Sequence, residues 1–429
     1  MSKQISAIRG MNDYYGEESA TLDYLVATAQ DVLSQYGYQS IRLPIVEKTE
    51  LFSRSIGAVT DIVEKEMYTF ADRNGDSLTL RPEGTAGCVR AVIQNGLTYN
   101  QVQKLYYTGP MFRYERPQKG RYRQFQQFGV EVFGLASADI DAELIALTAR
   151  LWARLGLENL ELQINSLGSK ETRQAYRTIL VAYLTEYKNQ LDEDSLRRLE
   201  TNPLRILDTK NPDLKEIVAN APKLIDHLDE QSKQHFELVK SYLDDAGIEY
   251  VVNPNLVRGL DYYNKTVFEW VTTELGAQGT VCAGGRYDGL VEKIGGKSVP
   301  ATGFAMGLER LMSLLIDKKL VNYDQTADIF IVLGEDSALR PGMAMAEQLR
   351  DENANIKVTM NCGGGSFKSQ FKKADKSGAS IALVLAEDEI NNQNITIKYL
   401  REKKDQETIA WSELNAKVAS IFNGEDLDE

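Results

Sequence analysis

The sequence contains few of the residue types on which several common catalytic and metal sites depend. It has only two histidines and three cysteines among 429 residues. His227 and His235 lie in one polar stretch, while Cys88, Cys282 and Cys362 are far from one another. These spacings disfavour a Ser-His-Asp triad, a histidine-rich metal site and a cysteine metal pair. We therefore expect no protein-held metal, and structural thiols in a reducing compartment.

The chain also lacks long apolar segments and an excess of positive charge. No apolar run approaches the ~18–20 residues that a membrane span needs, and the start, MSKQISAIRG, has no apolar core of a signal peptide. The formal net charge is −13, which excludes a uniformly basic nucleic-acid-binding protein. Any RNA must therefore bind local basic clusters. We expect a cytoplasmic globular protein whose chemistry depends on arginines, carboxylates and tyrosines.

Hydrophobic periodicity predicts the first elements of the chain. An apolar face with helical spacing indicates a helix over residues 19–36. A strand is expected over residues 41–46, where Pro44 suggests an edge or interface position. Residues 78–83 have the pattern of a strand that leads into a helix over residues 85–93.

Residues 104–134 are typical of an antiparallel hairpin with a long, cationic tip. Strands are expected over 104–115 and 124–134, joined by the loop RPQKGRYR. The alternation places Phe128, Val130 and Val132 on one face, and Gln127, Gly129 and Glu131 on the other. On the first strand we expect Arg113 and Glu115 to share a face. The polar face is interpreted as the floor of a site, with a plain solvated surface as the alternative.

The remaining pattern indicates two domains. A helix over residues 139–155 precedes a polar helical insertion at about 170–247, and strands return at 248–252 and 264–272. After residue 325, strand and helix patterns alternate, which predicts a small α/β domain with a largely parallel sheet. We therefore expect an α+β fold with a catalytic domain over residues 1–325 and a second domain over 326–429.

Several segments resemble those of a known enzyme family. FRYE at 112–115 with RYRQF at 121–125, and GFAMGLERL at 303–311, resemble motifs 2 and 3 of class II aminoacyl-tRNA synthetases, and Pro44 matches the proline of motif 1. RGLDYYNKTVFEW at 258–270 and AGGRYDGLV at 283–291 resemble the two signatures of histidyl-tRNA synthetases. The likeness covers nearly the whole chain.

The resemblance implies a fold, an activity and partners. The expected fold is a class II antiparallel-sheet catalytic domain with a helical insertion, followed by an α/β anticodon-binding-type domain. The expected enzyme is a homodimeric histidine–tRNA ligase that uses ATP, with Mg²⁺ bound through the ATP phosphates. Because the attacking group is a carboxylate already ionised at neutral pH, the reaction needs positioning and cations but no general base. That requirement agrees with the shortage of histidine.

The resemblance also implies residue roles in ATP binding and catalysis. Arg113 would hold the α-phosphate and the histidine carboxylate, and Arg258 would be the second catalytic cation. The remaining ATP contacts would come from Glu115 to the adenine amino group, Phe125 and Arg310 on the two faces of adenine, and Arg121 and Arg310 to the γ-phosphate. Asp261 is expected to orient Arg258 or a tyrosine.

The histidine and tRNA contacts are implied in the same way. Glu131 and Tyr263 would read the imidazole, and Tyr262 and Tyr287 would form pocket walls. Glu83, Thr85 and Gln127 would hold the α-ammonium group, while Arg113 and Arg258 complete the histidine site. The tRNA acceptor end would meet Arg116, Gln118, Lys119 and Arg123. In the second domain, Lys368, Lys372, Lys373 and Lys376 fit either an RNA-binding surface or a solvated helix face.

Two other functions share parts of this pattern. One is the synthetase-like regulatory subunit of ATP phosphoribosyltransferase, which generally lacks the second domain and often loses motif residues. The presence of Arg113, Glu115, Arg258 and Arg310 argues against it. The other is a class II synthetase for a different amino acid, which Glu131, Tyr263 and the RGLDYY segment disfavour.

Overall fold

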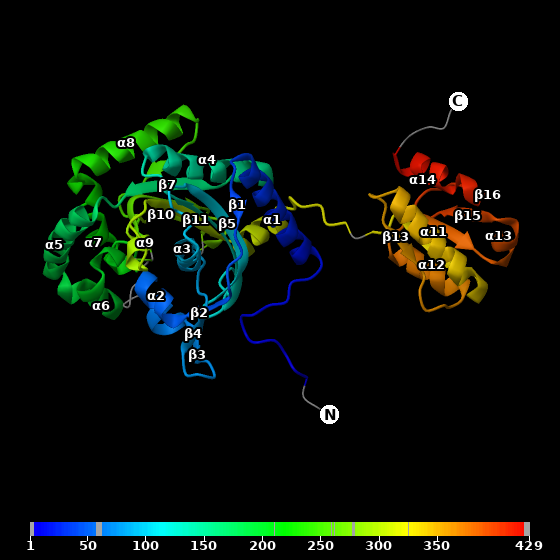
Figure 1. Cartoon of the computed structure of the whole chain (residues 1–429), viewed down its shortest axis with the longest axis horizontal. Helices are drawn as coiled ribbons and strands as arrows, with labels where there is room; N and C mark the ends of the chain where they lie inside the picture. Colours follow the sequence, from blue (N-terminus) through cyan, green and yellow to red (C-terminus); the bar gives the residue numbers. More distant parts are fainter. Residues whose placement is uncertain are drawn as a thin grey trace. The chain divides into compact units, whose positions relative to one another are not determined.

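The computed structural model describes residues 4–56, 62–209, 211–258, 260, 262–276, 279–324 and 326–423. The chain divides into two compact units, Met1–Asn322 and Tyr323–Glu429, drawn from blue to yellow and from yellow to red in Figure 1. The domain boundary expected at residues 325 and 326 falls within a few residues of this division. Among the helices of the described residues, none has the length and apolar character required to cross a bilayer.

The first unit is built on an eight-stranded sheet, with the order β1-β5-β6-β11-β10-β9-β7-β8. Its strands are β1 (Gln39–Ser40), β5 (Gln103–Phe112), β6 (Gln124–Phe133), β7 (Glu161–Ser166), β8 (Val251–Val252), β9 (Asn264–Val271), β10 (Thr280–Arg286) and β11 (Ala301–Gly307). All neighbours pair antiparallel except the outermost pairs, β1–β5 and β7–β8. The predicted antiparallel catalytic sheet is confirmed.

Helices cover one face of this sheet and enclose the larger core. They are α1 (Glu17–Gln35), α4 (Ala138–Leu155), α8 (Glu230–Asp245) and α10 (Leu308–Asp317). The predicted apolar face of α1 is confirmed, because Leu25, Ala29, Val32 and Leu33 are buried in this core. Each buried leucine or valine contributes roughly 1.5–3 kcal/mol. Figure 1 shows α4 and α8 along the same side of the sheet.

The opposite face of the sheet packs against a second core and carries the site. The helices there are α3 (Thr85–Gln94), α9 (Leu290–Lys293) and part of the helical insertion. Before α8, the insertion comprises α5 (Lys170–Glu186), η2 (Lys188–Gln190), α6 (Glu193–Thr201), η3 (Pro203–Ile206), η4 (Pro212–Leu214), α7 (Lys215–Ala219) and η5 (Leu224–His227). Pro203 and Pro212 each begin a new helical turn, because proline fits the first helical position but not the interior.

A small three-stranded sheet corrects one expectation. It contains β2 (Val46–Lys48), β3 (Tyr68–Ala71) and β4 (Ser77–Leu80), beside α2 (Thr49–Ile56) and the turn η1 (Ile62–Glu66). The strand predicted over residues 41–46 is wrong, because only Val46 lies in a strand. The carbonyls of Leu43 and Pro44 instead accept from the Arg81 guanidinium, at 2.9 and 3.4 Å. This side chain replaces the strand neighbour that the pattern implied.

The second unit holds a five-stranded sheet, with the order β13-β12-β14-β15-β16. Its elements are β12 (Ile329–Leu333), η7 (Asp336–Ala338), α11 (Leu339–Glu352), β13 (Val358–Met360), α12 (Phe367–Lys376), β14 (Ile381–Leu385), α13 (Glu387–Asn392), β15 (Asn394–Tyr399), β16 (Glu407–Ala410), η8 (Trp411–Glu413) and α14 (Leu414–Asn423). The expected largely parallel sheet is only half correct, since β15 and β16 pair antiparallel. Residues 386–393 alone join β14 to β15, and a parallel crossover needs about a dozen or more.

Candidate active site

The hairpin of β5 and β6 has the two faces that its alternation predicted. Phe128, Val130 and Val132 are buried in the core beneath α1 and α4. Glu131 lies on the opposite face and is only 1% exposed. The alternative of a plain solvated surface is therefore wrong, and the site floor stays the interpretation of this face. One related expectation is wrong: β5 ends at Phe112, so Arg113 and Glu115 do not share a strand face.

Glu131 is held by two tyrosine hydroxyls. Tyr107 donates to its Oε1 at 2.9 Å, and Tyr287 donates to its Oε2. Burial raises the pKa of Glu131 to about 8, against the lowering effect of the hydroxyl hydrogen bonds. A hydrogen-bond donor or a cation placed beside Glu131 would favour the ionised form of this carboxyl group.

Tyr107 is a residue beside Glu131 that the sequence did not indicate. Its ring fills space left by two glycines: a Cβ atom on Gly84 or Gly129 would lie 2.0 or 2.2 Å from that ring. Gly129 pairs directly with Tyr107 across the hairpin. The cross-strand pairing of the hairpin offered a signal. Because Gly129 is on the same face of the second strand as Glu131, its partner Tyr107 on the first strand must share that face.

Three further tyrosines, which were predicted to contact histidine, pack against one another near Glu131. The ring of Tyr262 lies 4.6 Å from that of Tyr263 and 5.5 Å from that of Tyr287, and Tyr263 and Tyr287 are 6.2 Å apart. All three side chains are buried. Their edge-on and tilted contacts make a rigid aromatic wall that faces Glu131 through Tyr287.

The residues expected to hold an α-ammonium group gather at the start of α3. Glu83 accepts from the backbone N–H groups of Thr85 and Ala86 at 2.6 and 2.9 Å. Gln127 accepts from the N–H of Gly84 at 3.1 Å. Burial raises the pKa of Glu83, and Glu83 is close enough to Glu131 to raise the pKa of that group as well. Two neighbouring buried carboxyl groups with raised pKa values favour a cationic ligand, because a cation stabilises their ionised forms.

Three of the cations predicted for catalysis or ATP binding, Arg113, Arg121 and Arg310, lie close to one another. The guanidinium of Arg113 lies 5.1 Å from the Phe125 ring centroid, and its Nε donates to the Pro82 carbonyl at 2.9 Å. Burial lowers the pKa of Arg310, and the nearby charges of Arg113 and Arg121 lower it further. Cations placed this close repel one another unless an anion joins them. The arrangement is therefore suited to a polyphosphate.

Two of the predicted ATP contacts are paired with each other in this structure. Arg121 forms an ion pair with Glu115, and its Nη2 lies 3.9 Å from a carboxylate oxygen of Glu66. Arg310 donates from Nε to the Gly120 carbonyl at 3.1 Å and from Nη1 to the Thr280 carbonyl. A nucleotide that used Glu115 and Arg121 separately would have to open this pair.

Arg258 has a carboxylate partner that the sequence interpretation did not identify. Its Nη1 pairs with Glu269 on β9, and Glu269 also accepts from the Thr280 hydroxyl at 3.2 Å. The guanidinium lies 5.3 Å from the Tyr263 ring centroid, so Arg258 borders the aromatic wall. Asp261, which was expected to orient Arg258, lies outside the described residues. Both residues lie within the RGLDYYNKTVFEW segment, but the sequence alone did not indicate that they pair.

The loop at the tip of the hairpin presents cations to solvent. Arg116, Gln118 and Lys119 are exposed, and Lys119 pairs loosely with Asp317 at 3.3 Å. Arg123 is half-buried, with its guanidinium 3.9 Å from the centroid of the Tyr114 ring. Of the four predicted tRNA contacts, three are therefore accessible as they stand.

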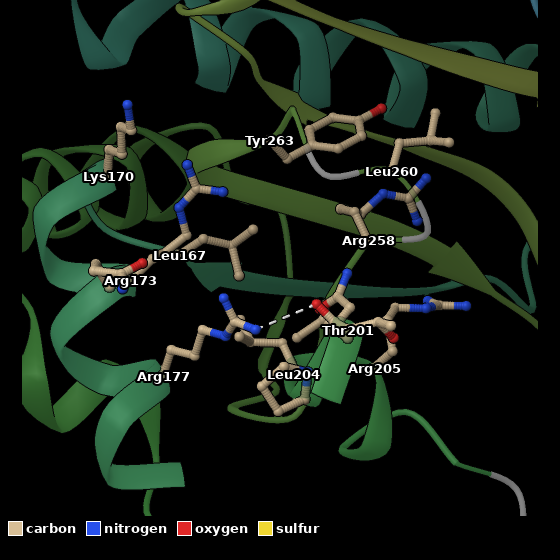
Figure 2. A pocket seen from close by; sticks show the side chains of 14 residues that line it. Leu167, Lys170, Arg173, Arg177, Thr201, Leu204, Arg205, Arg258, Leu260 and Tyr263 are labelled. Atoms are coloured by element: carbon tan, nitrogen blue, oxygen red, sulfur yellow. Dashed lines mark hydrogen bonds between the residues drawn. The ribbon is translucent and has the colours of Figure 1, made fainter. Parts of the chain in front are cut away.

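A basic pocket opens on the insertion side of Arg258. It has a volume of about 290 Å³ and lies between α5, η3 and the segment that carries Arg258 and Tyr263. Figure 2 shows Lys170, Arg173 and Arg177 of α5, with Arg205 and Arg258, around one cavity. None of the described lining residues is acidic, although the chain as a whole carries a charge of −13. We call these five cations and their cavity the basic pocket.

Comparisons with known proteins agree with this geometry. Residues 10–311 match the family model described as histidyl-tRNA synthetase, and residues 329–421 match that of the anticodon binding domain. A curated histidine–tRNA ligase of Hydrogenovibrio crunogenus is 75% identical over 414 residues, 96% of this chain and 97% of that one.

Solved structures agree as well. The apo histidyl-tRNA synthetase of S. aureus has a TM-score of 0.81 at 36% identity, covering 97% of this chain and 100% of that one. A Bacillus halodurans structure described as an ATP phosphoribosyltransferase regulatory subunit/histidyl-tRNA synthetase has a TM-score of 0.62 at 22% identity, covering 90% and 99%. This last likeness shows the fold alone. From the family match and the curated relative, the chain belongs to the histidyl-tRNA synthetase family.

Proposed function

We propose that the site activates histidine with ATP, giving histidyl-adenylate and pyrophosphate, and then transfers histidine to the 3′ end of tRNA(His). The enzyme is thus an aminoacyl-tRNA synthetase, a histidine–tRNA ligase. The observation that carries the proposal is the position of Glu131. Glu131 is buried and accepts from Tyr107 and Tyr287, and the adjacent Tyr262 and Tyr263 lie close to Arg113 and Arg258.

Selection of histidine follows from the polar groups in that pocket. A neutral imidazole offers one ring N–H donor and one ring nitrogen acceptor. We assign the donor to the Glu131 carboxylate and the acceptor to the Tyr263 hydroxyl, with Tyr262 and Tyr287 as walls. Buried partners of this kind reject amino acids that leave them unpaired. Glu83, Thr85 and Gln127 hold the α-ammonium group at the start of α3.

Activation then requires no general base. The histidine carboxylate forms a bond to the α-phosphorus of ATP while the bond to pyrophosphate breaks, and charge gathers on the phosphoryl oxygens. Arg113 and Arg258 are assigned to that charge as the catalytic residues.

The same site holds the nucleotide in the following way. Glu115 accepts from the adenine amino group, Phe125 and Arg310 lie on its two faces, and Arg121 and Arg310 take the γ-phosphate. Mg²⁺ enters with ATP and is held by its phosphates. Opening of the Arg121–Glu115 pair accompanies nucleotide binding.

For tRNA, we assign the acceptor end to the hairpin loop, through Arg116, Gln118, Lys119 and Arg123. The basic pocket offers further cations for phosphates close to the reacting centre, since it shares Arg258 with the site. Replacing Arg177 with alanine should raise KM for tRNA and flatten its salt dependence, with unchanged histidine-dependent exchange. Unchanged KM for tRNA would remove the basic pocket from the tRNA path.

We further assign the second unit to the anticodon, and a homodimer in the cytoplasm to the whole enzyme. Exposed apolar side chains around Pro44, namely Ile45, Val46 and Phe70, support an interface there. Sedimentation of the full chain as a monomer at micromolar concentration would refute the dimer. The three cysteines are free, which is consistent with a reducing compartment.

The deciding experiment is ATP–pyrophosphate exchange with each of the twenty amino acids. Exchange with histidine alone is expected, and it should disappear in Glu131→Gln. Exchange with a different amino acid would overturn the assignment of the pocket. No exchange with histidine would favour a regulatory role, in which case histidine binding measured by calorimetry would persist without turnover.

A further inference from the structure

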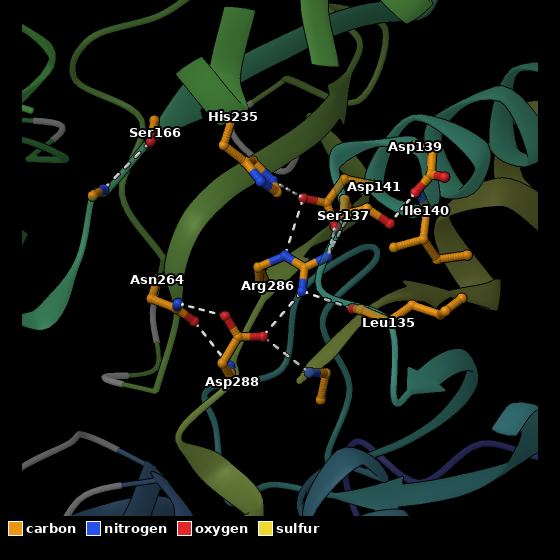
Figure 3. Close-up of polar contacts among 12 residues, drawn as sticks. Leu135, Ser137, Asp139, Ile140, Asp141, Ser166, His235, Asn264, Arg286 and Asp288 are labelled. Atoms are coloured by element: carbon orange, nitrogen blue, oxygen red, sulfur yellow. Dashed lines mark hydrogen bonds and ion pairs between the residues drawn. The ribbon is translucent and has the colours of Figure 1, made fainter. Parts of the chain in front are cut away.

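A network of polar side chains connects α4 and α8 to the end of β10. Arg286, at the end of β10, is fully buried. It donates to Asp141 from Nε and Nη2 at 3.2 and 2.9 Å, and to Asp288 from Nη1 at 3.0 Å. Nη1 and Nη2 also donate to the carbonyls of Leu135 and Ser137 at 3.0 and 3.1 Å. Figure 3 shows these contacts converging on one guanidinium.

One end of this network reaches the helical insertion. Nε2 of His235, on α8, lies 2.8 Å from Oδ2 of Asp141, the oxygen that Arg286 also contacts. Burial alone would raise the pKa of Asp141, but the contacts with His235 and Arg286 bring it below its ordinary value. Asp141 is therefore a charged link between α4, α8 and β10.

The other end reaches the two segments that carry the pocket tyrosines. Asp288 accepts from Nδ2 of Asn264 at 3.0 Å, and its own N–H donates to Oδ1 of Asn264 at 2.9 Å. Its Oδ1 also accepts from the N–H of Ala301 at 3.0 Å. Asp288 follows Tyr287 in the chain, and Asn264 follows Tyr263. The pairing of β9 and β10 shifts register between Gly285 and Arg286. At this irregular strand end, the side-chain hydrogen bonds of Asp288 and Asn264 therefore hold the two segments together.

On this basis, and relying on the function proposed above, we propose that Arg286, Asp141 and Asp288 are positioning residues for histidine recognition. They fix the strand ends from which Tyr287 and Tyr263 project toward the imidazole. His235 extends the same restraint to α8, so the insertion is connected to the amino-acid pocket. None of these residues touches the substrate.

A purely stabilising role accounts poorly for this arrangement. Desolvating several charges offsets most of their attraction, so a buried ion network is weak evidence for stability. Partners that orient binding residues, by contrast, commonly change affinity by about tenfold or more when lost. The network is anchored on the residues directly after Tyr263 and Tyr287, which is where orientation of the pocket would be set.

The test compares Asp288→Asn with a matched control, Glu143→Gln. Both side chains are part of ion pairs and are similarly exposed, at 28% and 31%, but Glu143 pairs with Lys104 away from the pocket. In ATP–pyrophosphate exchange, Asp288→Asn should raise KM for histidine by about tenfold and leave KM for ATP within about twofold. Glu143→Gln should change neither constant.

A second pair of variants tests the link to α8. His235→Phe removes the contact with Asp141 and should raise KM for histidine, whereas His235→Gln can still donate and should restore it. An unchanged KM for histidine in Asp288→Asn and His235→Phe, or equal changes in both KM values, would overturn the inference. Absence of histidine-dependent exchange in the unmodified enzyme would instead refute the proposed function.

Discussion

Replacing Glu131 with glutamine should make the catalytic unit more stable above neutral pH while abolishing histidine activation. The change keeps the shape of the side chain and removes its acidic group. In the folded chain, burial raises the pKa of Glu131 from 4.5 to about 8. The unfolded chain therefore loses this proton at a lower pH than the folded chain does.

The sign and size of the effect follow from proton linkage. Between pH 4.5 and about 8 the unfolded state binds fewer protons, so the free energy of unfolding falls as the pH rises. At about 1.4 kcal/mol per unit of pH, the penalty reaches about 3 kcal/mol at pH 7. Glutamine carries no such penalty, but it perturbs the hydrogen bonds from Tyr107 and Tyr287. This perturbation lowers the free energy of unfolding by about 1 kcal/mol. The variant should gain about 2 kcal/mol at pH 7 and nothing at pH 5.

Urea unfolding of both proteins at pH 5, 7 and 8 measures this difference. The stability of Glu131→Gln relative to the unmodified chain should rise across the series. A constant difference, or one that falls as the pH rises, would mean that the pKa of Glu131 is not raised in the folded chain. Histidine-dependent exchange by the same samples should be lost at every pH.

Three further outcomes are expected. Arg258→Ala should lower the rate of exchange by about 10²–10³-fold through loss of an electrostatic stabiliser, and near-normal exchange would contradict its catalytic role. Tyr107→Phe should raise KM for histidine by about tenfold, because Glu131 loses a donor; Tyr38→Phe, which removes a similar bond to Glu143, should not. Deleting residues 323–429, a separate compact unit, should preserve exchange and eliminate tRNA charging; equal loss of both would refute the domain roles.

Periodicity and local motifs in the sequence determined several secondary-structure elements and the type of chemistry expected of this protein. The apolar face of α1 and the alternation of β6 follow from side-chain spacing alone, so the helix, the hairpin and the polar face with Glu131 could be predicted. The shortage of histidine and the spaced arginines also indicated the type of chemistry. Each of these signals lies within a single element or loop.

Only the tertiary structure decided which distant groups meet. His235 and Arg286 contact Asp141 across 94 and 145 residues, and no local pattern records such pairs. The segment around Pro44 does not form the predicted strand, because its carbonyl groups accept hydrogen bonds from Arg81. β15 pairs antiparallel with β14, because the connection between them is too short for a parallel crossover. Packing across the sheet selects these partners, because a buried polar group must find whichever donor or acceptor the fold brings near it.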